Sequence, residues 1–243
     1  MKRTDKYTGL AAIYDRLMNH VNYKAWAKYI SEITLPVLPR HSKVLELAAG
    51  TGKFSTYFSE NYPNMVLSDL SASMLQIAEK RCIFPLVAAD FRHLPFREGA
   101  FDCVLCLYDS INYLLQQKEV AAMMLSVRSV LQPGGYFIFD CCLINGSIIH
   151  SESMYRSEHY KGVEVTQHSQ RVEKTNTHIN TFYMKFPSGE IILETHKQKI
   201  YPLSFFIKTL LINGFEVLHC FSDASFDNAT EDSHRAHIVA RKR

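Results

Sequence analysis

Segments with the pattern of a buried strand alternate with segments that have the pattern of an amphipathic helix between residues 43 and 141. The expected strands are 43–48, 65–69, 84–88, 101–107 and 136–141, and the expected helices between them are 53–61, 71–81 and 118–131. A helix between two consecutive strands implies that the strands pair in parallel through right-handed crossovers. The pattern therefore predicts a doubly wound α/β sheet.

Pro85 indicates the strand order of this sheet. It lies in the third expected strand, 84–88, where a residue without a backbone N–H is tolerated only at the edge of a sheet. In a doubly wound sheet of order 3-2-1-4-5, the third strand is at the edge. The proline therefore supports this order.

The pattern changes after residue 143. Polar and apolar residues alternate in four segments, as in antiparallel strands, with turns at 173–176 and 187–189; these segments are 150–158, 163–172, 178–186 and 191–200. A helix then ends at Gly214, and strands at 215–221 and 235–241 have no helix between them. We expect a mostly parallel seven-stranded sheet with a carboxy-terminal antiparallel hairpin and an inserted antiparallel β-layer at 144–200.

The whole chain is expected to form a single domain, 1–243. Its 243 residues are 47% hydrophobic, enough for a sizeable core. Residues 8–34 have the pattern of two short helices, so residues 1–36 are interpreted as a helical segment that precedes the first strand.

Charge and hydropathy exclude several classes of protein. Lys and Arg number 27 against 24 Asp and Glu, a formal charge of +3 that is too small to predict a nucleic acid as the main partner. The chain has no apolar run long enough to span a membrane and begins without the apolar stretch of a secretory signal. We expect a cytoplasmic protein that does not bind membranes; the oligomeric state is not predicted.

The six cysteines are expected to be core thiols, because most lie in apolar runs. Cys103 and Cys106 have the C-x-x-C spacing of metal and redox sites, but on a strand residues i and i+3 point to opposite faces. No metal site is predicted.

The turn after the first strand is the strongest indication of a site. Glu46 lies in that strand, and Gly50 and Gly52 lie in the turn that opens the following helix. Glycines lack Cβ atoms, so a ligand can lie against the peptide groups at the start of the helix. Dinucleotide-binding and nucleoside-binding proteins share such a turn, so it does not by itself identify the ligand.

Two aspartates follow the next two strands. Asp69, 19 residues after Gly50, is placed to accept hydrogen bonds from the two hydroxyls of a ribose. Asp90 could accept one from an exocyclic amine, with Phe91 or Leu70 against the base. Each acid also has a structural interpretation: Asp69 could cap the next helix with Ser71, Asp90 could be a turn residue, and Glu46 could pair with Lys43 or Lys53.

Charge distinguishes two cofactors. A dinucleotide carries a pyrophosphate with about two negative charges, which Glu46 would repel, whereas S-adenosylmethionine carries a sulfonium and an ammonium, which carboxylates attract. The acids favour S-adenosylmethionine. Residues 50–55 nevertheless match G-x-G-x-x-small, so an NAD(P)-dependent oxidoreductase remains the alternative.

Five successive motifs resemble those of class I S-adenosylmethionine-dependent methyltransferases. They cover about residues 40–142 and are Glu-Leu-Ala-Ala-Gly-Thr-Gly at 46–52, Ser-Asp-Leu-Ser-Ala-Ser-Met-Leu at 68–75, Ala-Asp-Phe at 89–91 before Leu-Pro-Phe at 94–96, Phe-Asp at 101–102, and Leu-Gln-Pro-Gly-Gly at 131–135. The resemblance implies that Glu46 and its turn hold the methionine part of the cofactor, that Asp69 holds the ribose, and that Asp90 and Phe91 hold the adenine. It also implies that Leu70, Met74 and Leu107 contact the cofactor.

One residue departs from the family pattern, which usually has a glycine at the position of Ala48. The approach of the cofactor to the backbone there is expected to be slightly looser. Tyr14 belongs to an amino-terminal segment similar to that of the small-molecule branch of the family, in which this segment folds over the cofactor. Tyr14 is therefore either a lid residue or an aromatic residue of an amphipathic helix.

Methyl transfer is an in-line displacement, to which an enzyme contributes chiefly alignment. Tyr108 and Asp109 follow the fourth strand, where the acceptor should meet the methyl group, and could orient or deprotonate it. Other side chains that could reach the acceptor come from the inserted layer: His150, His159, His196 and Tyr201.

A small-molecule acceptor with a nitrogen or oxygen nucleophile is favoured, because the Asp/Asn-Pro-Pro-Tyr signature of nucleic-acid amine methylation is absent. A non-catalytic RNA-binding protein that uses Arg235 and residues 241–243 is a further alternative.

Overall fold

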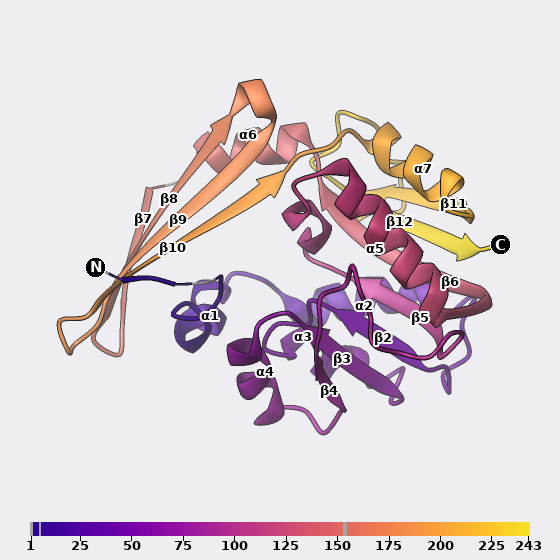
Figure 1. Cartoon of the computed structure of the whole chain (residues 1–243), viewed down its shortest axis with the longest axis horizontal. Helices are drawn as coiled ribbons and strands as arrows, with labels where there is room; N and C mark the ends of the chain where they lie inside the picture. Colours follow the sequence, from indigo (N-terminus) through magenta and orange to yellow (C-terminus); the bar gives the residue numbers. More distant parts are fainter. Residues whose placement is uncertain (1, 5, 153–154) are drawn as a thin grey trace.

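The computed structural model describes residues 2–4, 6–152 and 155–243, which form two β-sheets with helices (Figure 1). The larger sheet has the strand order β11-β12-β6-β5-β2-β3-β4. Its strands are β2 (Val44–Leu47), β3 (Met65–Asp69), β4 (Leu86–Ala88), β5 (Phe101–Cys106), β6 (Leu131–Cys142), β11 (Phe215–Ser222) and β12 (Arg235–Lys242). The predicted order 3-2-1-4-5 is confirmed, and β4 with its preceding Pro85 lies at the edge of the sheet.

The strands β4, β3, β2, β5 and β6 pair in parallel, and β12 pairs antiparallel with both β6 and β11. The predicted carboxy-terminal hairpin is therefore confirmed. β6 begins at Leu131, five residues before the expected start at Tyr136, and pairs through Leu131 with Phe101 before its register shifts.

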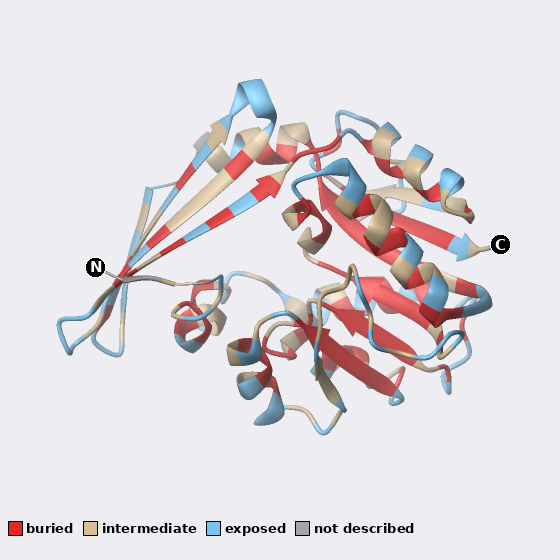
Figure 2. Ribbon diagram, viewed as in Figure 1, coloured by how far each residue is buried: buried red, intermediate tan, exposed pale blue. Residues whose placement is uncertain are grey.

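Helices cover both faces of the large sheet, because its central strands are apolar on both sides. Val44 packs in the core that includes α2 (Tyr23–Thr34) and α3 (Lys53–Phe58), whereas its neighbour Leu45 packs in the core that includes α5 (Gln117–Val130) and α7 (Leu203–Ile212). α4 (Ala72–Glu79) packs against β3 and β4, and Ser71 caps it by accepting the N–H of Met74 at 3.3 Å, as predicted. All four residues of β2 are buried (Figure 2).

The second sheet is the predicted β-layer, extended by a strand from the amino terminus. It has the order β1-β10-β9-β8-β7 and consists of β1 (Lys2–Arg3), β7 (Tyr155–Tyr160), β8 (Val163–Val172), β9 (Thr177–Lys185) and β10 (Ile191–Lys199). Helix α1 (Ala11–Leu17) packs Ile13 and Leu17 against this sheet in a separate hydrophobic cluster. The amino-terminal segment is thus attached to the β-layer that the sequence inserts after β6.

The prediction of a strand at 150–158 is wrong over its first part, because α6 (Ile144–Glu152) occupies this region and β7 begins at Tyr155. A Cβ on Gly146 would lie 2.3 Å from the carbonyl oxygen of His234, so only a glycine lets the helix approach that backbone so closely. Glycine is a poor helix former, and the contact that favours the helix is long-range. The local sequence could not reveal it.

The six cysteines have free thiols, and Cys103 and Cys106 are fully buried, which confirms the interpretation of this pair as core residues. In the described parts of the chain, no group of three or more potential metal ligands is present. None of the helices in those parts is long and apolar enough to cross a membrane.

Candidate active site

A cavity of about 910 Å³ lies at the carboxyl ends of β2, β3 and β5 and extends to the second sheet. Most of the residues predicted to bind the cofactor or to act on the acceptor line it: Tyr14, Glu46, Ala48, Gly50, Asp69, Leu70, Met74, Phe91, Leu107, Tyr108 and Asp109. The cavity lining does not include Gly52 or Asp90. The ends of the parallel strands thus bring together residues that the sequence separates by up to 95 positions, from Tyr14 to Asp109.

The turn after β2 presents backbone to this cavity. Ala48, Gly50 and Gly52 have φ angles of 51°, 57° and 70°, in the left-handed region. A Cβ built on Gly50 would have no atom within 4 Å beyond its immediate neighbours, so the backbone at this point faces open space. Ala48 carries a Cβ in a conformation that costs an L-residue about 1–2 kcal/mol. The usual glycine of the family would relieve that cost.

Glu46 is a buried carboxyl in the wall of the cavity, with 4% of its surface exposed. The Ser55 hydroxyl donates a hydrogen bond to its Oε2 at 2.5 Å; neither Lys43 nor Lys53, the partners considered from the sequence, is an ion-pair partner in the described structure. Burial and, to a smaller extent, the charge of Asp69 raise the pKa of Glu46 to about 8, although the Ser55 hydrogen bond opposes the shift. A cation in the cavity would favour the ionised form.

Asp69 connects the ends of two neighbouring strands. Its carboxylate accepts the N–H of Gly50 and the N–H of Ser71, each at 2.8 Å. Burial raises its pKa, while these backbone N–H groups counteract the shift. Asp69 therefore lines the cavity, as expected for a cofactor-binding residue, and also accepts a hydrogen bond from Ser71, the residue that caps α4.

The Asp90 side chain is not part of the cavity lining. Its carboxylate is bound by the guanidinium group of Arg92, with a shortest distance of 2.5 Å, and this interaction lowers the pKa of Asp90. Arg92 also pairs with Glu119 at 2.6 Å. Of the two residues assigned to the adenine by resemblance, the structure places Phe91 in the cavity wall and leaves Asp90 outside it.

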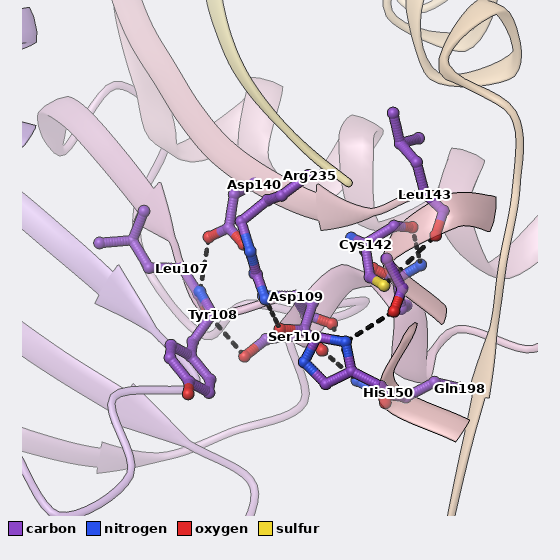
Figure 3. A network of polar contacts seen from close by, with 12 residues as sticks. Leu107, Tyr108, Asp109, Ser110, Asp140, Cys142, Leu143, His150, Gln198 and Arg235 are labelled. Atoms are coloured by element: carbon purple, nitrogen blue, oxygen red, sulfur yellow. Dashed lines mark hydrogen bonds and ion pairs between the residues drawn. The ribbon is translucent and has the colours of Figure 1, made fainter. Parts of the chain in front are cut away.

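Tyr108 and Asp109 form an unusual turn after β5. Both have positive φ angles, 60° and 48°, and the buried Asp140 carboxylate accepts their N–H groups at 2.5 and 2.8 Å (Figure 3). Arg235 pairs with Asp140 and with Asp109, at 2.8 Å from the latter, and Gln198 donates to Asp109 at 2.5 Å. Such left-handed residues cost about 1–3 kcal/mol each and concentrate at functional sites.

Sequence reasoning missed Asp140, Gln198 and the role of Arg235. The signal for Asp140 was an acidic residue inside the apolar strand 136–141, where a charge needs a partner. Arg235 was considered only as a contact for RNA, but its side chain is 17% exposed and is bound by two carboxylates.

The amino-terminal segment forms part of the wall of the cavity. Tyr14 lines the cavity and packs edge-to-face on Tyr7, with ring centres 5.7 Å apart. Asp15 accepts a hydrogen bond at 2.7 Å from the hydroxyl of Thr51, in the turn after β2, and also pairs with Arg81. These contacts attach the segment to the large sheet.

Of the four side chains that were expected to be able to reach the acceptor, two line the cavity and two do not. His150 and His196 line the cavity, whereas the cavity lining does not include His159 or Tyr201. The Nδ1–H of His150 donates a hydrogen bond to the Gly146 carbonyl oxygen, 2.6 Å away, which orients Nδ1 toward its own helix.

Comparisons with known proteins agree with this arrangement. Residues 44–135 match a family model described as a methyltransferase domain. "Putative methyltransferase YqeM" of Bacillus subtilis is 27% identical over 97% of this chain and 97% of its own length. The ubiquinone/menaquinone biosynthesis C-methyltransferase UbiE of Blochmanniella pennsylvanica is 34% identical over 58% of this chain and 59% of its own length.

Solved structures share the fold over nearly the whole chain. An S-adenosylmethionine-dependent methyltransferase from Clostridium acetobutylicum superposes with a TM-score of 0.80 and 23% identity, covering 97% of this chain and 98% of the other. The sugar N-methyltransferase KedS8 from Streptoalloteichus superposes with a TM-score of 0.75 and 20% identity, covering 95% and 92%. The matching domain and the relative that is similar over nearly the whole chain confirm the resemblance to S-adenosylmethionine-dependent methyltransferases, and the sheet order agrees with it.

Proposed function

We propose that this protein transfers a methyl group from S-adenosylmethionine to a nitrogen or oxygen nucleophile of a small molecule. The observation that carries the proposal is a pair of buried carboxyl groups, Glu46 and Asp69, in the wall of one cavity beside an open backbone turn. Neither has a cationic side chain as ion-pair partner within the described residues. A cationic ligand would supply the missing positive charge.

The residues of the cavity fit the parts of S-adenosylmethionine. Glu46 and the turn at Gly50 would hold the methionine part, and Asp69 would hold the ribose. Phe91 and Leu70 would pack against the adenine, because both line the cavity and offer apolar surface. The bound cofactor supplies an electrophilic methyl group on a positively charged sulfur.

The remaining part of the cavity would bind the acceptor. It is lined by polar side chains of α6, β8, β9 and β10, namely Ser147, His150, Gln167, His178, Asn180, His196 and Gln198. A wall rich in hydrogen-bonding groups suits a polar acceptor. The sugar N-methyltransferase among the structural neighbours also acts on a polar molecule, as its name states, whereas UbiE is named as a C-methyltransferase.

Tyr108 and Asp109 would orient the acceptor at the methyl group. Asp109 lines the cavity and is fixed by Arg235 at 2.8 Å and Gln198 at 2.5 Å, so its carboxylate has a defined direction. A fixed carboxylate can align an acceptor through the N–H of a neutral amine or through a hydroxyl, without reorganising during the reaction.

The test is the release of S-adenosylhomocysteine with a panel of small amines, amino sugars and phenols, followed by mass spectrometry of each acceptor. We expect one acceptor class to gain a methyl group on nitrogen or oxygen, and Asp109→Asn to lower that rate by about 10- to 100-fold through lost alignment. Methylation of carbon alone, or of RNA or protein in place of the small molecules, would contradict the proposal. NADPH that binds more tightly than S-adenosylhomocysteine would favour the oxidoreductase alternative.

A further inference from the structure

We propose that one wall of the acceptor cavity carries a proton relay, formed by Tyr7, Tyr113, His196 and Glu194, which takes up the proton that the acceptor loses on methylation. The inference rests on the proposed function and narrows its substrate class to acceptors whose nucleophile carries a removable proton. Tyr7, Tyr113 and His196 all line the cavity.

The four side chains form a continuous series of contacts. The hydroxyls of Tyr7 and Tyr113 are 2.6 Å apart, and the Tyr113 hydroxyl is 3.0 Å from Nδ1 of His196. The other ring nitrogen of His196, Nε2, is 3.4 Å from Oε2 of Glu194. The residues come from three segments: the chain before α1, the 3₁₀ helix η1 (Ser110–Tyr113) and strand β10.

Glu194 gives this series a direction because it is a fully buried carboxyl group whose oxygens accept the backbone N–H groups of Tyr7, Gly9 and Leu10. Burial opposes its ionisation, but the hydrogen bond of His196 and the N–H groups of Gly9 and Leu10 hold the pKa of Glu194 below its ordinary value. An ionised carboxylate only accepts hydrogen bonds. Nε2 of His196 must then carry the proton, which leaves Nδ1 as the acceptor for the hydroxyl of Tyr113.

The two tyrosines pass a proton along the relay and do not themselves become ionised. Burial raises the pKa of Tyr7 and of Tyr113, so both hydroxyls stay neutral. His196, 2% exposed and next to Glu194, is the group in which a positive charge is compensated. The relay therefore ends on the imidazole, as in sites where a carboxylate orients a histidine base.

Each methyl transfer releases one proton from the acceptor, and the relay would take up this proton. The bond between the methyl carbon and sulfur breaks and leaves its electron pair on sulfur, while a bond forms between that carbon and the nitrogen or oxygen of the acceptor. The proton of the acceptor passes to the Tyr7 hydroxyl, the proton of Tyr7 passes to Tyr113, and the proton of Tyr113 passes to Nδ1 of His196. An acceptor without such a proton would gain nothing from the relay.

The direct test is the tautomer of His196, which needs no knowledge of the acceptor. Nitrogen-15 NMR of the whole protein with labelled histidine, assigned with His196→Gln, should show a proton on Nε2 and none on Nδ1 at neutral pH. Tyr113→Phe should shift the Nδ1 resonance toward that of a nitrogen without a hydrogen-bond donor. A proton on Nδ1, or an Nδ1 resonance unchanged by Tyr113→Phe, would overturn the relay whether or not the protein is a methyltransferase.

Kinetics with the acceptor from the panel supply the second measurement. Tyr113→Phe and His196→Gln should lower kcat by about 10²- to 10⁴-fold, the range for loss of acid–base catalysis. Both should leave the calorimetric affinity for S-adenosylhomocysteine unchanged. Tyr183→Phe removes a partly exposed tyrosine hydroxyl from strand β9 of the same sheet and should retain full activity. Unchanged kcat in Tyr113→Phe would also overturn the relay.

Discussion

The carboxylate of Asp69 accepts a hydrogen bond from the backbone N–H of Gly50 at 2.8 Å and thereby ties the end of β3 to the turn after β2. Gly50 in turn exposes its backbone to the cavity because no side chain covers it. One contact thus fixes the shape of the turn and places a carboxylate beside it. The strand ends, rather than any single loop, organise the site.

Glu46 should couple cofactor binding to pH. Its carboxyl group, with a pKa of about 8 in the free protein, is mostly protonated at neutral pH, and a cationic ligand should favour the ionised form. Binding of S-adenosylmethionine should therefore release most of one proton near pH 7, and the affinity should rise as the pH approaches 8. Calorimetry in buffers of different ionisation enthalpy measures this release.

Glu46→Gln is the control for this coupling because it cannot ionise and can still accept the hydroxyl of Ser55. Its proton release should be close to zero. The raised pKa also means that the folded protein binds more protons than the unfolded chain between the two pKa values. Glu46 should therefore make the free wild-type protein lose stability as the pH rises from about 4.5 to 8, a loss that Glu46→Gln should not show.

Ala48→Gly should stabilise the protein by up to about 1 kcal/mol. The substitution removes a left-handed strain of about 1–2 kcal/mol, and the greater freedom of glycine in the unfolded chain offsets part of this gain. Urea unfolding measures the difference. Ala49→Gly is the matched control, because Ala49 does not have a positive φ angle and should lose about 0.5–1 kcal/mol. A loss of stability in Ala48→Gly would contradict the strain assigned to this residue.

Asp140→Asn should destabilise the protein by about 3 kcal/mol, because it removes one carboxylate from a buried ion pair and leaves Arg235 with Asp109 alone. The N–H groups of Tyr108 and Asp109 would also lose part of their acceptor. Chemical denaturation tests this. Glu216→Gln breaks a pair with Arg241 at the surface and should leave the midpoint unchanged. Equal midpoints for both variants would show that the Asp140 pair does not hold the turn.

The large sheet could be predicted because its strands are short apolar runs separated by regular helices, and Pro85 indicated its edge. The position of Asp69 at the cavity could be predicted from its distance of 19 residues along the chain from Gly50. The pair of Asp140 and Arg235 could not, because 95 residues separate them and no local pattern relates them. Helix α6 was missed for a similar reason, since Gly146 is explained only by its approach to His234.

The attachment of the amino-terminal segment to the second sheet could not be predicted from the sequence either. Glu194 accepts hydrogen bonds from the N–H groups of Tyr7 and Leu10 at 2.9 and 3.0 Å, across more than 180 residues. In the sequence, Glu194 is one more polar residue of an alternating strand. Only the folded chain shows that it is buried and faces the segment before α1.

The most direct test of the acidic cavity as the S-adenosylmethionine site is calorimetry with that ligand on wild type and Asp69→Ala. The variant should bind about 10- to 100-fold more weakly, as expected for the loss of charged hydrogen bonds. Asp102→Ala is the matched control: Asp102 also accepts a backbone N–H, that of Lys43 at 2.6 Å, but lies outside the cavity lining, and its variant should keep the wild-type affinity. Equal affinities for wild type and Asp69→Ala, or no binding to the wild type, would contradict the assignment.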